Sequence, residues 1–267
     1  YETAWLKKYY PAEFMSALMT SVKGDPRQIS KYIRNCKEMG IDVLPPDVTR
    51  SEKQCSVQDG AVRFGLMGIK NVGEAVIDEI LRVREEHGIT GDFEDFINSL
   101  DISKINRKAV ESLIKAGAFD KLNSNRAQLL AVYEPLLESA HNASKKNVAR
   151  QLSLFGDAGD LSAGIMDVVG HADVKMALPD IRNFDKPALL AMEKEMLGVY
   201  VSGHPLEDYE QRISELSNIS TDIMDLSEEQ AAEYDGKRVT LAGMIVSRRT
   251  MITRKNTMMA FLQLEDL

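Results

Sequence analysis

Residues 68–76 (GIKNVGEAV) combine residue types that could hold an anion. Gly68 and Gly73 flank a short turn that opens an amphipathic helical pattern, and glycine lets a backbone come close to a partner. The first N–H groups of a helix are unpaired and lie at the positive end of its dipole, which favours a phosphate there. Lys70 adds a positive charge and Asn71 a side-chain donor. The pattern predicts a sequence-independent phosphate contact; the alternative is a plain connection between two helices that needs glycines only for its turn.

A second segment with a similar layout follows at residues 92–120. It has an apolar lead-in, a turn without the glycine, and an amphipathic helix that Asn106 can cap and Gly117 can end. The first segment resembles a helix-hairpin-helix element, which binds the DNA backbone, and two such elements commonly pair into one module that straddles a duplex. The second hairpin then either contacts phosphate or packs against the first. The predicted DNA-binding residues are Gly68, Lys70, Asn71, Val72, Gly73, Ser103, Lys104, Asn106, Arg107 and Lys108.

The pentapeptide QLSLF (residues 151–155) places three large apolar side chains between a basic stretch and a small, acidic, glycine-containing stretch. A short buried segment is one interpretation, but no alternation extends beyond the pentapeptide. A short apolar peptide in a flexible chain is typical of docking into a partner's pocket. The pentapeptide also resembles the motif with which bacterial replication proteins bind the ring-shaped sliding clamp (the beta subunit). The predicted clamp-binding residues are Gln151, Leu152, Ser153, Leu154 and Phe155.

Composition limits the class of protein. The chain has 267 residues, 44% of them hydrophobic, and a net charge of −8. The negative charge concentrates in residues 131–236, so the flanking parts stay compatible with a phosphate backbone. No apolar run approaches the length of about 18 residues that a membrane span needs. Two cysteines favour reduced thiols in a cytoplasmic protein over a disulfide framework or a zinc site. The sequence does not begin with Met, and we expect it to be part of a longer protein.

The periodicity predicts a mainly α-helical fold with a small C-terminal β segment. Helices are expected after Asp25, over 73–87, over 106–117 and over 187–197, together with a helix that is kinked at Pro135. Residues 143–170 read as a flexible linker. Short strands are expected near AVRFGL and on either side of the RKNT turn.

Several segments together resemble the alpha subunits of bacterial DNA polymerase III, the C-family replicative polymerases. They are AWLKKYYPAEFMSALMTS, GIDVLPPDV, RFGLMGIKNVGEAV, ESLIKAGAFD, NRAQLL and EKEMLGVYVSGHPL. The resemblance implies four regions: residues 1–60, the end of the fingers domain; 61–142, a tandem helix-hairpin-helix module; 143–236, a clamp-binding linker and helical segment; and 237–267, the truncated start of an OB-fold.

The resemblance also implies a role. The region would be a non-catalytic part of a DNA-directed DNA polymerase, a nucleotidyltransferase, and would confer processivity by binding duplex DNA and the clamp. The palm aspartates that hold magnesium are expected elsewhere, so no catalytic residue, metal ligand or cofactor is assigned here. Other polymerase III holoenzyme subunits are expected partners, and a membrane is not. The alternatives are a helix-hairpin-helix DNA-repair enzyme, for which Lys108 and Lys115 would be the available lysines, and an interaction scaffold that does not bind DNA.

Overall fold

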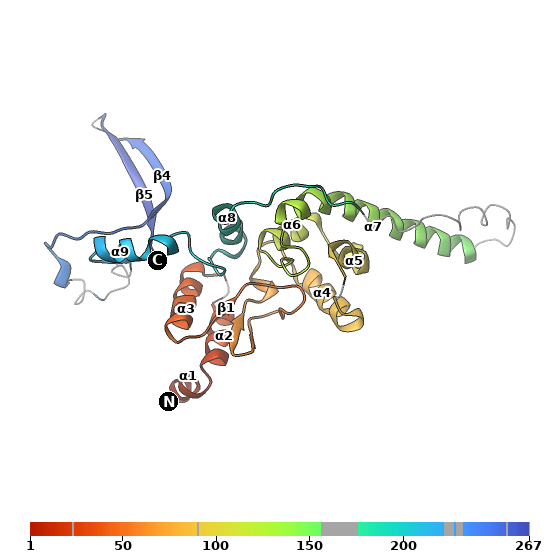
Figure 1. Ribbon diagram of the computed structural model, residues 1–267, viewed down its shortest axis with the longest axis horizontal. Helices are drawn as coiled ribbons and strands as arrows, with labels where there is room; N and C mark the ends of the chain where they lie inside the picture. Colours follow the sequence, from red (N-terminus) through yellow and green to blue (C-terminus); the bar gives the residue numbers. More distant parts are fainter. Residues whose placement is uncertain are drawn as a thin grey trace. The chain divides into compact units, whose positions relative to one another are not determined.

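The computed structural model of the protein describes residues 1–22, 24–89, 91–155, 176–221, 227, 232–254 and 256–266 (Figure 1). For residues 87, 144 and 146–155 the description covers the backbone alone. Contacts divide the chain into a larger unit, Tyr1–Ser202, and a smaller unit, Gly203–Leu267. The described chain is mainly α-helical with a small β portion, as the periodicity predicts.

The larger unit begins with three helices: α1 (Glu2–Tyr9), α2 (Pro11–Ser21) and α3 (Pro26–Glu38). The predicted cap of α3 is confirmed, since the Asp25 carboxylate accepts hydrogen bonds from the backbone N–H groups of Arg27 and Gln28. Helix α3 buries Ile29 and Cys36.

A small sheet follows, with strands β1 (Val43–Leu44), β2 (Ser56–Gln58) and β3 (Ala61–Arg63) in the order β1-β3-β2. Strand β3 is the strand expected in AVRFGL. Its antiparallel partner β2 is joined to it by Asp59 and Gly60, which both have positive φ, the geometry typical of an Asp-Gly hairpin turn. The parallel pairing of β3 with β1 was not predicted, because no short-range signal links two strands so far apart in the sequence.

The two segments singled out in the sequence each place a short 3-10 element before a helix, and the second also has a helix ahead of it. The first comprises η1 (Leu66–Gly68) and α4 (Glu74–His87); the second comprises α5 (Phe93–Ser99), η2 (Ile102–Lys104) and α6 (Arg107–Lys115). The predicted helix ends are confirmed: Gly73 and Gly88 flank α4, and Asn106 caps α6 through its side chain. The aromatic rings of Phe93 and Phe96 pack edge-on against Phe119 in the core.

Helix α7 (Arg126–Phe155) is longer than expected. It passes through Pro135 and continues over residues 143–155, where a flexible linker was predicted. The physical reason is that this stretch holds no glycine or proline before Gly156, and most of its residues are compatible with a helix. The remainder of the predicted linker, up to residue 170, lies outside the described residues. Helix α8 (Lys186–Leu197) has the predicted form, with Asp185 as its cap and Gly198 in the left-handed region at its end.

The smaller unit contains η3 (Glu207–Tyr209), α9 (Glu210–Leu216), η5 (Ala232–Tyr234) and the antiparallel strands β4 (Met244–Ile252) and β5 (Met258–Glu265). The RKNT turn is confirmed, with Asn256 at a φ of 57°. The strand before the turn begins at Met244. Many apolar side chains of these strands are exposed, among them Ile245, Ile252, Met258, Phe261 and Leu262. Two strands do not define an OB-fold, which therefore stays a prediction.

Candidate nucleic-acid interface

The two hairpin turns are closed by the same type of hydrogen bond, although the first has a residue of positive φ, Asn71, where the second continues a 3-10 helix. The first hairpin turn (residues 69–72) is closed by a hydrogen bond from the N–H of Val72 to the carbonyl of Ile69 at 3.4 Å. The second hairpin turn (residues 102–105) is closed by the matching bond from Ile105 to Ile102 at 3.3 Å. Each turn leads directly into a helix, α4 or α6. The layout predicted for the second segment is therefore present, although its turn lacks the glycine.

Each turn contacts the helix of the other hairpin at equivalent positions. Asn71 in the first turn donates its side-chain N–H to Oγ of Ser112 in α6 at 3.1 Å. Lys104, at the corresponding position of the second turn, donates to Oε2 of Glu79 in α4 at 2.8 Å. Asn71 adopts a φ of 64°, a conformation that asparagine and glycine tolerate best. These reciprocal contacts join the two hairpins into one module.

The buried carboxylate of Glu79 is the centre of the link on the α4 side. Besides Lys104, it accepts hydrogen bonds from Arg82, at 3.1 and 2.5 Å, and from the N–H of Asp101 at 2.9 Å. The Arg82 hydrogen bond first, and those of Lys104 and Asp101 after it, lower the pKa of Glu79 to about 2, although burial opposes the shift. Neither Glu79 nor Ser112 was predicted from the sequence. The only indication in the sequence was that each is a polar residue on the otherwise apolar face of its helix.

The starts of α4 and α6 present free backbone donors. Among the described residues, the N–H groups of Glu74, Ala75, Arg107 and Lys108 have no acceptor. Gly73 also has an ordinary φ of −81°, and a Cβ there would meet nothing within 4 Å. The fold therefore does not require glycine at this position, whereas an incoming backbone would benefit from the space.

Gly68 and Val72 have roles in the fold. A Cβ on Gly68 would lie 2.3 Å from Cε1 of the buried Phe64 ring, so the glycine is needed for packing. The Val72 side chain is buried in the hydrophobic core. In the second hairpin, both the hydroxyl and the N–H of Ser103 donate to the Asp101 carboxylate. Among the predicted DNA-binding residues, these three therefore also shape the packing and the turn.

The side chain and the backbone of Lys70 both donate hydrogen bonds to the C-terminal end of α8. Its ammonium donates to the carbonyl of Glu195 at 2.8 Å, and its backbone N–H donates to the carbonyl of Met196 at 3.0 Å. The C-terminal end of a helix carries a partial negative charge, which a lysine stabilises. Lys70 therefore fastens α8 to the first hairpin turn.

The cations of the second hairpin differ in their partners. Lys104 pairs with Glu79, and Arg107 pairs with Glu138 of α7 at 2.5 Å. Lys108 is exposed and has no hydrogen-bond or ion-pair partner in the part of the chain that the structure describes. Of the four cations predicted to contact phosphate, Lys108 is thus the one left unpaired within the described chain.

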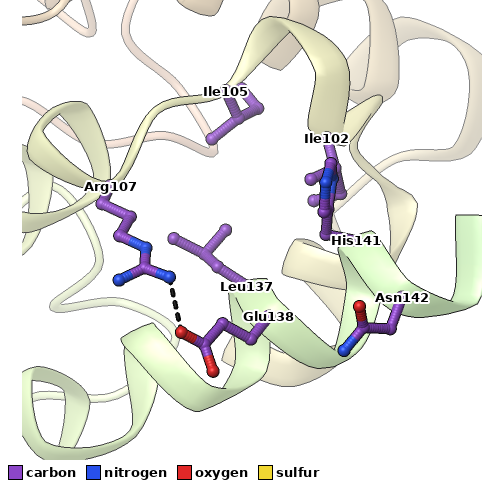
Figure 2. A pocket seen from close by; sticks show the side chains of 7 residues that line it. All are labelled: Ile102, Ile105, Arg107, Leu137, Glu138, His141 and Asn142. Carbon is purple, nitrogen blue, oxygen red and sulfur yellow. Dashed lines mark hydrogen bonds and ion pairs between the residues drawn. The ribbon is translucent and has the colours of Figure 1, made fainter. Parts of the chain in front are cut away.

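A pocket of about 380 Å³ lies between the second hairpin and α7 (Figure 2). Ile102, Ile105 and Leu137 supply its apolar surface, and Arg107 and Glu138 face each other at its side, joined by their ion pair. His141 and Asn142, further along α7, complete the lining.

The predicted clamp-binding residues lie at the end of α7. The backbone of residues 151–155 forms the last turns of that helix, and their side chains are outside the description. Within the described ranges, no group of three or more His, Cys, Asp or Glu residues is arranged to hold a metal ion. Likewise, none of the described helices is long and apolar enough to cross a membrane.

The paired turns and their following helices are those of a helix-hairpin-helix module, and a family model for the helix-hairpin-helix motif matches residues 40–129. Over all of its residues the chain is also similar to curated proteins named DNA polymerase III subunit alpha. It is 37% identical to the protein of Mycobacterium tuberculosis, 38% to that of Borreliella burgdorferi and 31% to that of Vibrio cholerae. The chain thus belongs to the family of DNA polymerase III alpha subunits, and it spans 22% of the length of these relatives.

Proposed function

We propose that the chain binds the backbone of duplex DNA through its two hairpins and a sliding clamp through residues 151–155. In this role it increases the processivity of a replicative polymerase without taking part in the chemistry. The family membership and the helix-hairpin-helix match support the DNA-binding half. The pentapeptide QLSLF supports the clamp-binding half.

The observation that carries the DNA-binding half is the pair of helix starts with free N–H groups on one module. Glu74 and Ala75 offer them in α4, and Arg107 and Lys108 in α6, beside the open space at Gly73. Backbone donors contact phosphate oxygens without reading the bases, which suits an enzyme that must hold any sequence. A repair enzyme or a scaffold without DNA has no comparable support, since the relatives named above are polymerase subunits.

The wider role follows from the same proposal. DNA-directed DNA synthesis, with magnesium held by palm aspartates, belongs to the full-length protein, and we expect this chain alone to incorporate no nucleotide. Other holoenzyme subunits would be further partners, in the cytoplasm.

Two binding measurements test the proposal. The purified chain should bind a labelled duplex of arbitrary sequence, and log K should fall linearly with log salt concentration. It should also bind a purified sliding clamp, and Leu154→Ala with Phe155→Ala should abolish that interaction while Ser153→Ala preserves most of it. Duplex affinity that is absent at low salt would remove the first half, and clamp binding that survives the double substitution would remove the second.

A further inference from the structure

Arg107 stands at the position where a cation would be most useful to a DNA-binding hairpin. It is the first residue of α6, next to the free N–H groups and beside the unpaired Lys108. The equivalent position at the start of α4 is Glu74. The start of α6, with Arg107 and Lys108, is therefore the more positively charged of the two helix starts. However, the guanidinium of Arg107 is ion-paired with Glu138 on α7 (Figure 2).

The contact with Glu138 can open readily. A single N–H of Arg107 donates to one carboxylate oxygen of Glu138 at 2.5 Å, so the pair lacks the two parallel bonds of the strongest arginine–carboxylate contacts. The two side chains are 55% and 60% exposed, and ion pairs between such exposed groups are weak and screened by salt. The pocket beside them gives the Arg107 side chain space to change its rotamer.

We propose that Glu138 competes with DNA phosphate for Arg107. The second hairpin then contacts the backbone through Lys108 in every bound state, and through Arg107 only when the Arg107–Glu138 pair opens. Glu138 is therefore a residue that limits duplex affinity, although it does not contact DNA. The inference rests on the proposed function and deepens it, because it names which cations of the module contribute to binding.

A charge-matched series of variants tests the competition in the full chain. Glu138→Gln removes the competing charge and keeps the shape of the side chain. Glu134→Gln is the control: it removes the same charge one turn earlier on α7, from a residue that is hydrogen-bonded to Tyr133 and not to Arg107. Arg107→Gln combined with Glu138→Gln asks whether any gain depends on the arginine. Each variant is titrated with a labelled duplex of arbitrary sequence at several salt concentrations.

The expected result is a gain of binding in one variant. Glu138→Gln should bind about 3–10-fold more tightly at low salt, and its slope of log K against log salt should steepen by about 0.9, the value for one additional phosphate contact. Glu134→Gln should change the affinity for duplex less than about twofold, because it alters only the long-range electrostatic potential at the second hairpin. The double variant should lose the gain.

The failures of the two proposals are distinguishable. If the wild-type chain shows no salt-dependent duplex binding, the proposed function is contradicted and the competition with it. If the wild-type chain binds but Glu138→Gln matches Glu134→Gln, or binds more weakly than the wild type, the competition alone is contradicted. A gain that persists in the double variant would also contradict it.

Discussion

Lys70, Lys104 and Arg107 each place a positive charge beside a hairpin turn, and each uses it within the molecule. Their partners are a helix-end carbonyl, a buried carboxylate and an exposed carboxylate, respectively. A cation that supports the fold is costly to redirect toward DNA, and the cost differs among the three because the partners differ in burial. At the scale of residues, charge and sequence position alone therefore do not identify the phosphate contacts.

A substitution at Gly73 should separate an effect on DNA binding from an effect on stability. Replacing it with alanine should change the free energy of unfolding by less than about 0.5 kcal/mol, since the φ is ordinary and the space is open. In the proposed complex the same methyl group would stand where the DNA backbone approaches, so the affinity for duplex should fall several-fold. Thermal unfolding and fluorescence anisotropy measure the two effects.

Gly68→Ala is the matched control for Gly73→Ala. Its new methyl group would collide with the buried Phe64 ring, and we expect a loss of about 1–3 kcal/mol in stability. Equal destabilisation by the two alanines would mean that Gly73 is also a packing glycine, and its assignment to the interface would fail.

The sequence predicted the helix starts of the site correctly but not the state of each side chain. The Gly73 turn and the Asn106 cap depend on neighbouring residues, so they are visible in a short stretch of sequence. The bond from Lys70 to Glu195 joins residues that are far apart in the chain, and no local pattern reports it. The same limit applies to Arg107 and Glu138.

At the scale of elements, the two hairpins depend on each other. The second turn reaches α4 through Lys104 and Glu79, and the first turn reaches α6 through Asn71 and Ser112. The Glu79 side is the stronger link, because its carboxylate is fully buried and accepts several charge-assisted hydrogen bonds. The spacing of the two helix starts, and hence of the phosphates they could hold, is fixed by these contacts.

The Glu79 link gives the stability a defined pH dependence. Its folded pKa of about 2 lies below the ordinary value of 4.5, so the folded protein favours the ionised form. The resulting stabilisation is complete above about pH 4.5 and is lost as the pH falls toward 2. Glu79→Gln should therefore cost about 1–3 kcal/mol near pH 7. The difference from the wild type should shrink below pH 4.5, as measured by denaturant unfolding at several pH values.

Glu86→Gln provides the comparison for Glu79→Gln. Glu86 pairs with the same Arg82, but its side chain is 51% exposed, and its removal should cost less than about 0.5 kcal/mol at any pH. A Glu79→Gln variant that is as stable as Glu86→Gln at pH 7 would contradict the role of the buried carboxylate.

The sequence predicted the ends of helices well, but it did not predict contacts between residues that are far apart in the chain. Asp25 and Asn106 cap their helices as expected, because caps are encoded by one or two adjacent residues. Helix α7 is longer than predicted, because the polar composition of residues 143–155 predicts a linker. A helix with a polar surface and no breaker has the same composition as a flexible chain, so composition cannot separate them.

At the scale of the whole molecule, α7 connects the two proposed contacts. Its first residue, Arg126, is buried and held by the Asp120 carboxylate and by the carbonyl of Lys115 at the end of α6. Its last residues are 151–155, which form the proposed clamp peptide. The helix has 30 residues, and at the usual rise such a helix is about 45 Å long. The DNA module and the clamp peptide are thus joined by one continuous helix.

Because one helix joins the two proposed contacts, binding of DNA and binding of the clamp should each strengthen the other. When the hairpins hold a duplex that passes through a clamp, binding of the peptide becomes intramolecular, and the apparent affinity should exceed that for the free clamp by about 10–100-fold. Lys108→Glu should reduce this gain although Lys108 is remote in sequence from the pentapeptide, and it should leave the affinity for free clamp unchanged. Dissociation rates from free clamp and from clamp loaded on primed DNA measure both quantities. If the chain leaves the two at the same rate, either the hairpins do not engage the duplex or α7 cannot span both sites, and the affinity of the chain for the duplex alone decides which.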